Sequence, residues 1–411
     1  NPAASSNGML TIFEDQTSPS NGLVNRISSS YNTGWMHGDI KGAFLSDTDD
    51  TNATELVNNH NFNGGITGWT IDLAGASGGS PGITVVSGKL RFQQGSSNSV
   101  WLSAYQDITT VVGKKYLLNI DIASSNTSAN WRIFAASTKI LGYPSYLNQG
   151  QHSATFVATS TSSRILIQQG GSASTVGEVN SVSVKLVDDD RSVNDHYLRV
   201  FGTIEKHPVA SGADLVGYRP DSSSQGTNYF QLPLTSSIFD LTGDWSITFW
   251  AKRNGNTAVN YSGFEISPDD ISSNNAYSII PFSMYIQGDG AMGLRGASVT
   301  GNNVGDEKVF GVVNNWRCLN IVQRNGTLSL YIDGRFHSST SATFANPSSA
   351  YSLSIFRFTY SQGRHDGRRH IDFSLFRMSE TAPTEEQIKK MFYDERELFV
   401  ENAKCTLHGT S

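Results

Sequence analysis

The chain has 411 residues, and at roughly 150 residues per domain this length predicts two or three domains. Charged residues make up 16% and apolar residues 37%, so Ser, Thr, Asn and Gly replace charge while ordinary cores can still form. With 10% aromatic residues, this composition favours strands joined by many turns and argues against long helices, which are rich in Ala, Glu, Lys and Leu.

Charge and hydropathy exclude two classes of partner. Thirty Lys and Arg stand against 36 Asp and Glu, so the chain lacks the basic excess that nucleic acid binding needs. No stretch approaches the roughly 18 consecutive apolar residues of a membrane span, so we expect no membrane insertion. Because the sequence opens on Asn1 without a basic-then-apolar leader, we expect it to be processed or cut from something longer.

The two cysteines do not indicate a metal or disulfide framework. Cys318 and Cys405 lie far apart and have no CxxC or Cys/His companion. We therefore expect two unpaired thiols.

Residues 1–54 predict a strand-rich segment that ends in a linker. Residues 9–13 form a short apolar run, and turn residues interrupt every later run up to Leu45. Two or three such strands cannot form a core of their own, so the segment is expected to pack on a neighbour. The acidic, Thr- and Asn-rich stretch 47–54 shows no periodicity and is interpreted as the linker.

Residues 55–188 predict a β-sandwich of antiparallel strands. Short alternating runs follow one another, each closed by Gly, Asn or Ser. The clearest run is 181–187, where Val182, Val184 and Leu186 share one face.

Residues 189–396 predict a second sandwich, which begins after a charged hinge at 188–191. Within it, residues 244–250 alternate and place Trp245, Ile247 and Phe249 on one face. The fold class is therefore all-β, with two sandwich domains in series.

Three residue pairs predict tight hairpins, because Gly, Asn and Asp tolerate the positive φ of two-residue turns. These pairs are Ser87-Gly88, Asn325-Gly326 and Asp333-Gly334. The last two flank residues 328–332 and so predict a three-stranded meander.

One helix is predicted near the C-terminus. Thr384 and Gln387 have the spacing of a capping box, in which each side chain satisfies a free backbone amide of the other. Ile388, Met391 and Phe392 then form an apolar stripe at helical spacing, which Leu398 would extend. We expect the stripe to seal one end of the second sandwich, with partner binding as the alternative, and residues 397–411 to form a C-terminal extension.

Two family resemblances follow from these segments. Residues 55–62 with Gly68-Trp69-Thr70 resemble the opening of family 4/9 carbohydrate-binding modules, and the similarity continues to Val184. This resemblance implies a jelly-roll fold and says less about ligand, since many such jelly rolls bind no sugar. Residues 192–396 resemble concanavalin A-like, laminin-G-type domains. The matching stretches are 243–251, Trp316 with 330–334, and 371–376.

The joined arrangement also resembles a group of tailed-bacteriophage virion proteins. The similar stretches are 31–35, 38–43, 190–194 and 389–407. This resemblance implies a piece of a phage tail fibre or surface appendage, located in the virion. The implied partners are other virion proteins and host cell-surface polysaccharide, with assembly as a homo-oligomer.

A glycan-binding sandwich needs flat aromatic faces beside polar side chains, because a sugar offers C–H patches and hydroxyl groups. The candidates in the first sandwich are Trp101, Tyr105, Trp131, Tyr143 and Tyr146, accompanied by Asn98, Asn130 and Gln151. Core or turn packing is the alternative for each aromatic residue. Trp69 is left out, because the Gly-Trp position in this pattern more often fills the core.

The second sandwich contains a basic loop, 364–370, in which Arg364 and Arg368 could grip the carboxylate or sulfate of an acidic glycan. The alternative is a loop that is simply solvated. Oxygen-rich loops at 268–270 and 288–290 would suit calcium, but neither has EF-hand-like spacing, so we predict no cofactor and claim no calcium site.

Catalysis finds little support in the sequence. The chain has no GxSxG, HExxH, P-loop or CxxC motif, and we interpret Asp121 and Glu178 as rim residues and not as an acid/base pair. The leading hypothesis is a non-enzymatic virion protein that contacts host-surface glycans. The alternatives are an accessory binding region of a polysaccharide-degrading enzyme, or an architectural virion protein without a ligand.

Overall fold

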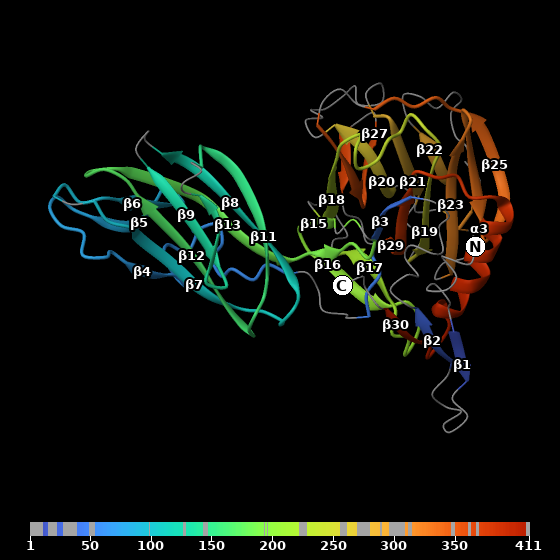
Figure 1. Cartoon of the computed structure of the whole chain (residues 1–411), viewed down its shortest axis with the longest axis horizontal. Coiled ribbons are helices and arrows are strands. Elements are labelled where there is room, and N and C mark those ends of the chain that lie inside the picture. Colours follow the sequence, from blue (N-terminus) through green and yellow to red (C-terminus); the bar gives the residue numbers. More distant parts are fainter. Residues whose placement is uncertain are drawn as a thin grey trace. The chain divides into compact units, whose positions relative to one another are not determined.

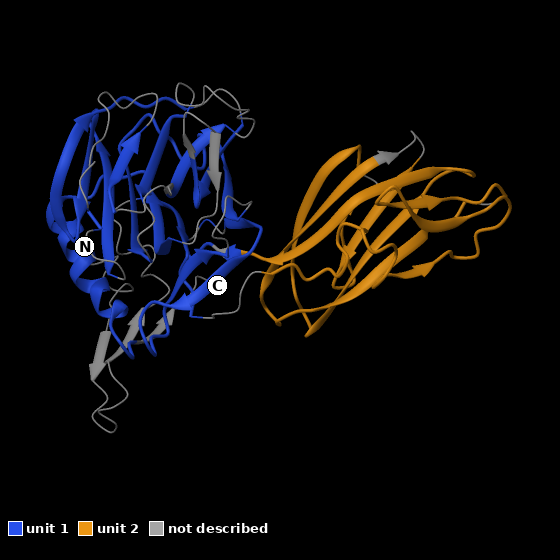
Figure 2. Cartoon of the chain, turned by 180° about the vertical axis from the view of Figure 1, so that it is seen from behind, with its two compact units in different colours: residues 1–52, 188–411 blue, residues 53–187 orange. Residues whose placement is uncertain are grey.

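The computed structural model divides the chain into two compact units, coloured separately in Figure 2. Unit 1 comprises residues 1–52 and 188–411, and unit 2 comprises residues 53–187. Strands dominate both units, so the predicted all-β fold is confirmed. The structure describes residues 11–14, 23–27, 39–48, 54–97, 99–125, 129–142, 147–192, 194, 196–221, 228–254, 261–268, 280–287, 290–295, 309–310, 315–346, 350–360, 363–366 and 370–407.

Unit 2 is a sandwich of two five-stranded antiparallel sheets (Figure 1). Sheet A has the order β10 (Thr138–Gly142), β9 (Asn130–Ala135), β12 (Ser162–Gly170), β7 (Leu102–Thr109) and β4 (Thr70–Asp72). Sheet B has the order β11 (Gly150–Val157), β8 (Lys115–Ser125), β13 (Val176–Leu186), β6 (Lys89–Gln93) and β5 (Gly82–Val86).

The core of unit 2 lies between sheets A and B and follows from alternation along the strands. Val182 and Val184 of β13 are completely buried, as the period of two predicts. From sheet A, the indole of Trp131 meets the ring of Phe92 in sheet B edge to face, with ring centroids 5.4 Å apart.

The polar residues at the start of unit 2 form hydrogen bonds within the unit. The Glu55 carboxylate accepts hydrogen bonds from the backbone N–H of Val57 and of Val184 and from the Ser183 hydroxyl group. The Asn59 side chain accepts from the Gly64 N–H and also donates to backbone carbonyls of the same loop. The stretch that resembles carbohydrate-binding modules therefore fastens the start of the unit to β13.

Unit 1 is a larger sandwich of sheets C and D, with two small sheets beside it. Sheet C has the order β14 (Asp188–Asp189), β15 (Tyr197–Phe201), β18 (Tyr229–Leu234), β26 (Tyr351–Ile355), β20 (Tyr261–Pro268), β21 (Phe282–Gln287) and β22 (Met292–Arg295). Sheet D has the order β16 (Ile204–Pro208), β17 (Val216–Pro220), β29 (Ile371–Ser379), β19 (Trp245–Arg253), β23 (Trp316–Arg324), β24 (Thr327–Ile332) and β25 (Arg335–Ser341). The small sheets are β1 (Thr11–Glu14), β2 (Leu23–Ile27) and β30 (Lys404–Leu407), and β27 (Arg357–Tyr360) with β28 (Gly363–Asp366).

Aromatic rings fill the core between sheets C and D. Phe249 of sheet D meets Phe264 of sheet C nearly edge to face, and Trp245 meets Phe282 in the same way. Trp245, Ile247 and Phe249 are completely buried on one face of β19, as predicted.

The N-terminal segment joins unit 1 through β3 (Ile40–Phe44), which pairs antiparallel with β29 of sheet D. Asp190 accepts a hydrogen bond from the Ala43 N–H, and Asp188 accepts one from the Leu45 N–H. The residues interpreted as a charged hinge therefore hold the end of β3 in place. Asp47, at the start of the interpreted linker, pairs with Lys206 at 3.0 Å.

The three predicted hairpins are confirmed, and each turn residue has a positive φ. The pairs are Ser87-Gly88 between β5 and β6, Asn325-Gly326 between β23 and β24, and Asp333-Gly334 between β24 and β25. The meander β23–β24–β25 forms one edge of sheet D.

The predicted helix is α3 (Glu385–Glu395), and the capping box between Thr384 and Gln387 is present. A 3-10 turn, η3 (Arg396–Phe399), follows it and buries Leu398. Ile388 and Met391 pack on Val322 of sheet D. Val322 faces away from the core of unit 1, because its neighbour Ile321 points into it, so the helix covers the outer face of sheet D and not an end of the sandwich.

The C-terminal extension expected at 397–411 contributes β30, which pairs in parallel with β2. Among the described residues, no helix is long and apolar enough to cross a membrane.

Candidate functional site

The outer face of sheet A, which is turned away from the core of unit 2, is the candidate functional site. Phe134 of β9, Leu166 of β12 and Tyr105 of β7 lie opposite one another on adjacent strands. All three are partly exposed, whereas their neighbours along each strand are buried. They form a short apolar row across the sheet, and we call this surface the platform. It consists of Trp101, Tyr105, Arg132, Phe134, Arg164, Leu166 and Gln168.

Tyr105 is covered by an arginine that has its own anchor. The guanidinium carbon of Arg164 lies 4.1 Å from the centre of the Tyr105 ring. Its Nε and one terminal nitrogen donate to the two carboxylate oxygens of Asp107, each at 2.8 Å. These hydrogen bonds hold the pKa of Asp107 below its usual value. The bidentate pair fixes the plane of the guanidinium group over the ring.

Trp101 repeats this arrangement four residues earlier, directly before β7 begins. Its indole lies over Gly170 of β12, where an added Cβ atom would come within 2.9 Å of the ring. The guanidinium carbon of Arg132 is 3.8 Å from the indole centre. Gly170 therefore gives the indole the space to lie flat on the sheet.

Polar side chains connect the two aromatic positions. Gln168 of β12 lies opposite Arg132 on one side and Ser103 on the other, and its amide donates to the Ser103 hydroxyl group at 3.1 Å. Asn130 lies opposite Gly170 and is partly exposed. The platform thus alternates apolar rings with hydrogen-bonding groups across three strands.

The structure places the predicted site residues in three groups. Trp101, directly before β7, and Tyr105, within it, lie on the same face of sheet A, and Asn130 belongs to β9 of that sheet. Gln151 belongs to β11 of sheet B and is not part of the platform. Tyr143, Tyr146, Asn98 and Arg368, as well as the side chain of Arg364 in β28, lie outside the described residues.

Trp131 is a correction, because it is completely buried in the core of unit 2. Alternation along β9 turns Trp131, Ile133 and Ala135 inward and leaves Arg132 and Phe134 on the outer face. An indole in that position has no face to offer a ligand. Trp69, which the sequence assigned to the core, is buried against Phe62.

Sequence reasoning missed Phe134, Leu166, Arg132 and Arg164. The alternating runs on β9 and β12 mark these residues as outward-facing, but nothing in the runs reveals that β12 lies between β9 and β7 in one sheet. The register that brings the residues together depends on pairings between strands far apart in the sequence.

A metal site in a protein requires acidic, histidine or cysteine side chains close together. The described residues contain no group of three or more His, Cys, Asp and Glu side chains that could hold a metal ion. Asp121 accepts a hydrogen bond from Asn180, and Glu178 lies 4.0 Å from the Lys89 amine. Of the loops considered for calcium, residues 269–270 and 288–289 lie outside the described residues.

Comparisons with known proteins give no family assignment. No protein-family profile matches the chain, and no curated protein matches it. Among solved structures, it is similar to the receptor binding domain of botulinum neurotoxin C/D mosaic serotype, with 15% identity, TM-score 0.37, and coverage of 50% of this chain and 48% of that one. It is also similar to the binding domain of Paraclostridial Mosquitocidal Protein 1, with 17% identity, TM-score 0.37, and coverage of 50% and 49%.

A third similar structure is the botulinum neurotoxin serotype D binding domain, with 15% identity, TM-score 0.36, and coverage of 50% and 48%. This chain therefore spans about half the length of each of these domains. TM-scores and identities this low carry no inference about ligand or activity.

Proposed function

We propose that the chain is a non-enzymatic binding protein and that unit 2 binds carbohydrate on the platform. The observation that carries the proposal is the repeated pairing on β7. Trp101, directly before β7, and Tyr105, within it, each contact an arginine of the same sheet, namely Arg132 of β9 and Arg164 of β12. Four residues along a strand span about 13 Å, so the two rings suit an oligosaccharide better than a single sugar.

The chemistry of the platform matches that of a sugar chain. Pyranose rings present C–H patches that pack on aromatic and aliphatic faces, and Leu166 and Phe134 extend such a surface beside Tyr105. Hydroxyl groups accept and donate hydrogen bonds, for which guanidinium, amide and carboxylate groups are the suitable partners. Arg132, Arg164, Gln168 and Asp107 supply these groups around the rings.

The biological setting is also a proposal, and it rests on the resemblance to tailed-bacteriophage virion proteins. In that setting the chain is displayed on a tail fibre or surface appendage, contacts other virion proteins as a homo-oligomer, and touches host cell-surface polysaccharide. An open platform binds weakly, and repeated copies on one particle would raise the avidity without a deep pocket.

The test is glycan-array binding by the whole chain, followed by calorimetric titration with each glycan that binds. Tyr105→Ala and Arg164→Ala should each weaken binding about fivefold to thirtyfold, because each removes part of the stacked Tyr105–Arg164 surface and its hydrogen-bonding groups, at a cost on the order of 1–2 kcal/mol. Arg91→Ala, which removes an arginine from β6 in sheet B, is the matched control and should leave affinity unchanged.

The alternatives predict other outcomes of the same experiment. Release of reducing sugar during long incubation would assign the chain to a polysaccharide-degrading enzyme and would contradict a non-enzymatic role. Flat titrations against every host polysaccharide, together with a large protein–protein interface in images of the assembled particle, would assign an architectural role. Equal binding by the Tyr105→Ala variant and the native chain would remove the platform from the proposal.

A further inference from the structure

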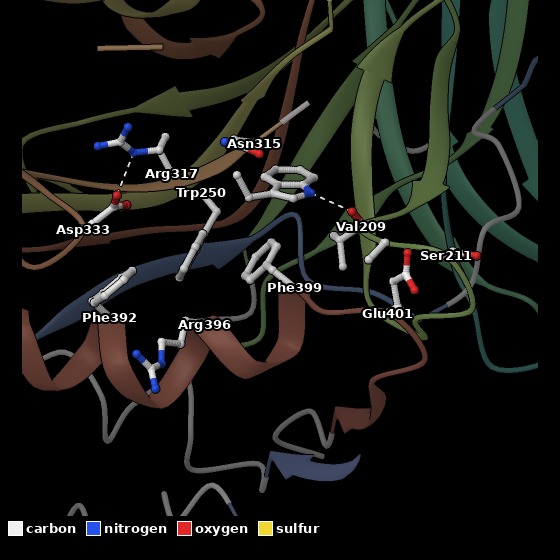
Figure 3. A pocket seen from close by; sticks show the side chains of 12 residues that line it. Val209, Ser211, Trp250, Asn315, Arg317, Asp333, Phe392, Arg396, Phe399 and Glu401 are labelled. Carbon is white, nitrogen blue, oxygen red and sulfur yellow. Dashed lines mark hydrogen bonds and ion pairs between the residues drawn. The ribbon is translucent and has the colours of Figure 1, made fainter. Parts of the chain in front are cut away.

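Unit 1 contains a cavity of about 630 Å³ where the C-terminal helix crosses the outer face of sheet D (Figure 3). Strands β19 and β23 form one side of the cavity, α3 and η3 form another, and the loop after β16 closes a third. Exposed Asn315 and Glu401 lie at its mouth. This volume falls within the roughly 300–1,000 Å³ typical of small-molecule sites.

The wall of the cavity is aromatic and rigid. Phe399 stacks on Trp250, with centroids 4.1 Å apart and planes at 20°, and lies 5.1 Å from the ring of Trp316 at 52°. The Trp250 Nε1 donates to the buried carboxylate of Glu395, which also pairs with Arg377. The Trp316 Nε1 donates to the Val209 carbonyl oxygen at 2.7 Å. Each indole is therefore fixed by a hydrogen bond, and the partly exposed Trp316 and Phe399 present a preformed apolar corner.

The rim of the cavity is polar, and its two arginines are paired with carboxylates. On one side, Arg317 is paired with Asp333 at 2.6 Å, and Asp333 also accepts a hydrogen bond from the backbone N–H of Cys318. Arg396 projects from the helical segment below Phe392 and pairs with Glu397 at 3.0 Å, and Glu401 lies near Val209 and Ser211 (Figure 3). Both arginines are thus already paired with carboxylates, Arg317 with Asp333 and Arg396 with Glu397, and Glu401 is the further carboxylate of the lining. Asn315 adds a neutral amide.

This combination selects the class of ligand. An acyl chain would bury the charged groups of the rim without forming hydrogen bonds to them, which costs free energy. A phosphate or sulfate group would meet Asp333 and Glu401 while both arginines are already paired, and an organic cation would lie close to both arginines. A neutral molecule with an apolar face and many hydroxyl groups can pack on the Trp316–Phe399 corner and form hydrogen bonds with the polar rim.

We infer that the unit 1 cavity is a second carbohydrate site, which takes one neutral sugar ring, with its C–H face on Trp316 and Phe399 and its hydroxyl groups on Asn315 and Glu401. This inference goes beyond the proposed function, because it concerns the other unit and a concave pocket in place of the platform. Either site can bind without the other.

The experiment uses the whole chain labelled with 5-fluorotryptophan and observed by fluorine NMR. The Trp316 resonance reports on the cavity and the Trp101 resonance on the platform in the same sample. Trp316→Phe and Trp101→Phe assign the two signals. Should Trp316→Phe fail to fold, Asn315→Ala provides the assignment, because it alters an exposed neighbour and moves the Trp316 signal.

The probes are the methyl glycosides of glucose, galactose, mannose, N-acetylglucosamine and rhamnose, with sialic acid and glucosamine as charged comparisons. We expect at least one neutral glycoside to shift the Trp316 signal saturably. Glu401→Gln and Asn315→Ala should each weaken that binding about tenfold, as loss of a hydrogen bond to the ligand would. Lys389→Ala, on α3 outside the cavity, should not change it.

Three results would overturn the inference. They are a Trp316 signal that no neutral glycoside moves, tighter binding of sialic acid or glucosamine than of every neutral probe, and unchanged affinity in both rim variants. The Trp101 signal keeps the two proposals separate. If a glycan shifts only the Trp101 signal, the platform alone is supported. If it shifts only the Trp316 signal, the cavity alone is supported.

Discussion

At the scale of single residues, the space left by Gly170 decides how Trp101 is presented. The indole lies where any larger residue would place its Cβ atom, so the flat position of the ring depends on a residue of the neighbouring strand. Trp101 and Trp131 look alike in the sequence, yet one lies on the platform and the other in the core. The sequence of a strand shows which residues share a face, but it does not indicate which face points inward when both faces carry aromatic residues.

Gly170→Ala should therefore impair the platform more than the fold. The new methyl group would displace the indole from Arg132, while alanine regains about 0.5–1 kcal/mol of backbone entropy that glycine loses in a strand. We expect the Trp101 fluorine signal to move and glycan affinity to fall, with little change in the unfolding midpoint. Gly82→Ala on β5, where the added Cβ meets nothing within 4 Å, is the control. An unmoved Trp101 signal would show that the contact does not hold the ring.

The carboxyl group of Asp188 makes the stability of unit 1 depend on pH. Burial raises the pKa of this carboxyl to about 6, against the attraction of Lys206 and the hydrogen bonds from Leu45 and Tyr218. The pKa of an unfolded aspartate is about 3.9, so the stabilising contribution of this group is fully present below that pH and is lost as pH rises through about 6.

Asp188→Asn removes the titration and isolates this contribution. The unfolding free energy of the native chain minus that of the variant should fall by on the order of 2–3 kcal/mol between about pH 4 and pH 7. Urea unfolding across that range measures the difference. A difference that stays flat or grows with rising pH would contradict the raised pKa.

At the scale of elements, local residue types predicted the turns and the helix, but they did not predict which strands pair with one another. Asn325-Gly326 and Asp333-Gly334 could be assigned because only a few residue types adopt positive φ there. The pairing of β3 with β29 could not, because a period of two gives the face of a strand and not its neighbour. The stripe on α3 indicated that the helix was amphipathic, but the sandwich offered several apolar surfaces that could have received it.

The contact between α3 and sheet D depends on a buried ion pair. Arg377 of β29 donates to Glu395 at the end of α3, and both side chains are almost completely buried. Arg377→Met should destabilise unit 1 by about 3–5 kcal/mol, because it leaves the Glu395 charge buried without its partner. Urea unfolding followed by tryptophan fluorescence measures the loss.

The double variant Arg377→Met with Glu395→Gln separates charge from packing. The neutral amide can still accept the hydrogen bond from Trp250, so most of the lost stability should return. If the double variant is no more stable than the single one, the cost lies in packing and not in the unpaired charge.

At the scale of the whole molecule, unit 2 is an insertion in unit 1. Residues 1–52 and 188–411 form one body, and the chain leaves and re-enters it on either side of unit 2. The two ends of unit 2 are adjacent, because the Leu56 N–H donates to the Val184 carbonyl oxygen at 3.0 Å. An element inserted through adjacent ends adds a binding surface without disturbing the host fold.

Excision tests this organisation. Residues 53–187 expressed alone should unfold cooperatively and keep the platform, since their core is confined to sheets A and B. The remaining chain, with a short Gly/Ser linker between residues 52 and 188, should keep the cavity, because Asp188 and Asp190 can still bind the backbone at the end of β3. Circular dichroism and the Trp101 and Trp316 fluorine signals report on each half. If either half is unfolded, the units depend on each other for stability, and the two carbohydrate sites cannot be independent modules.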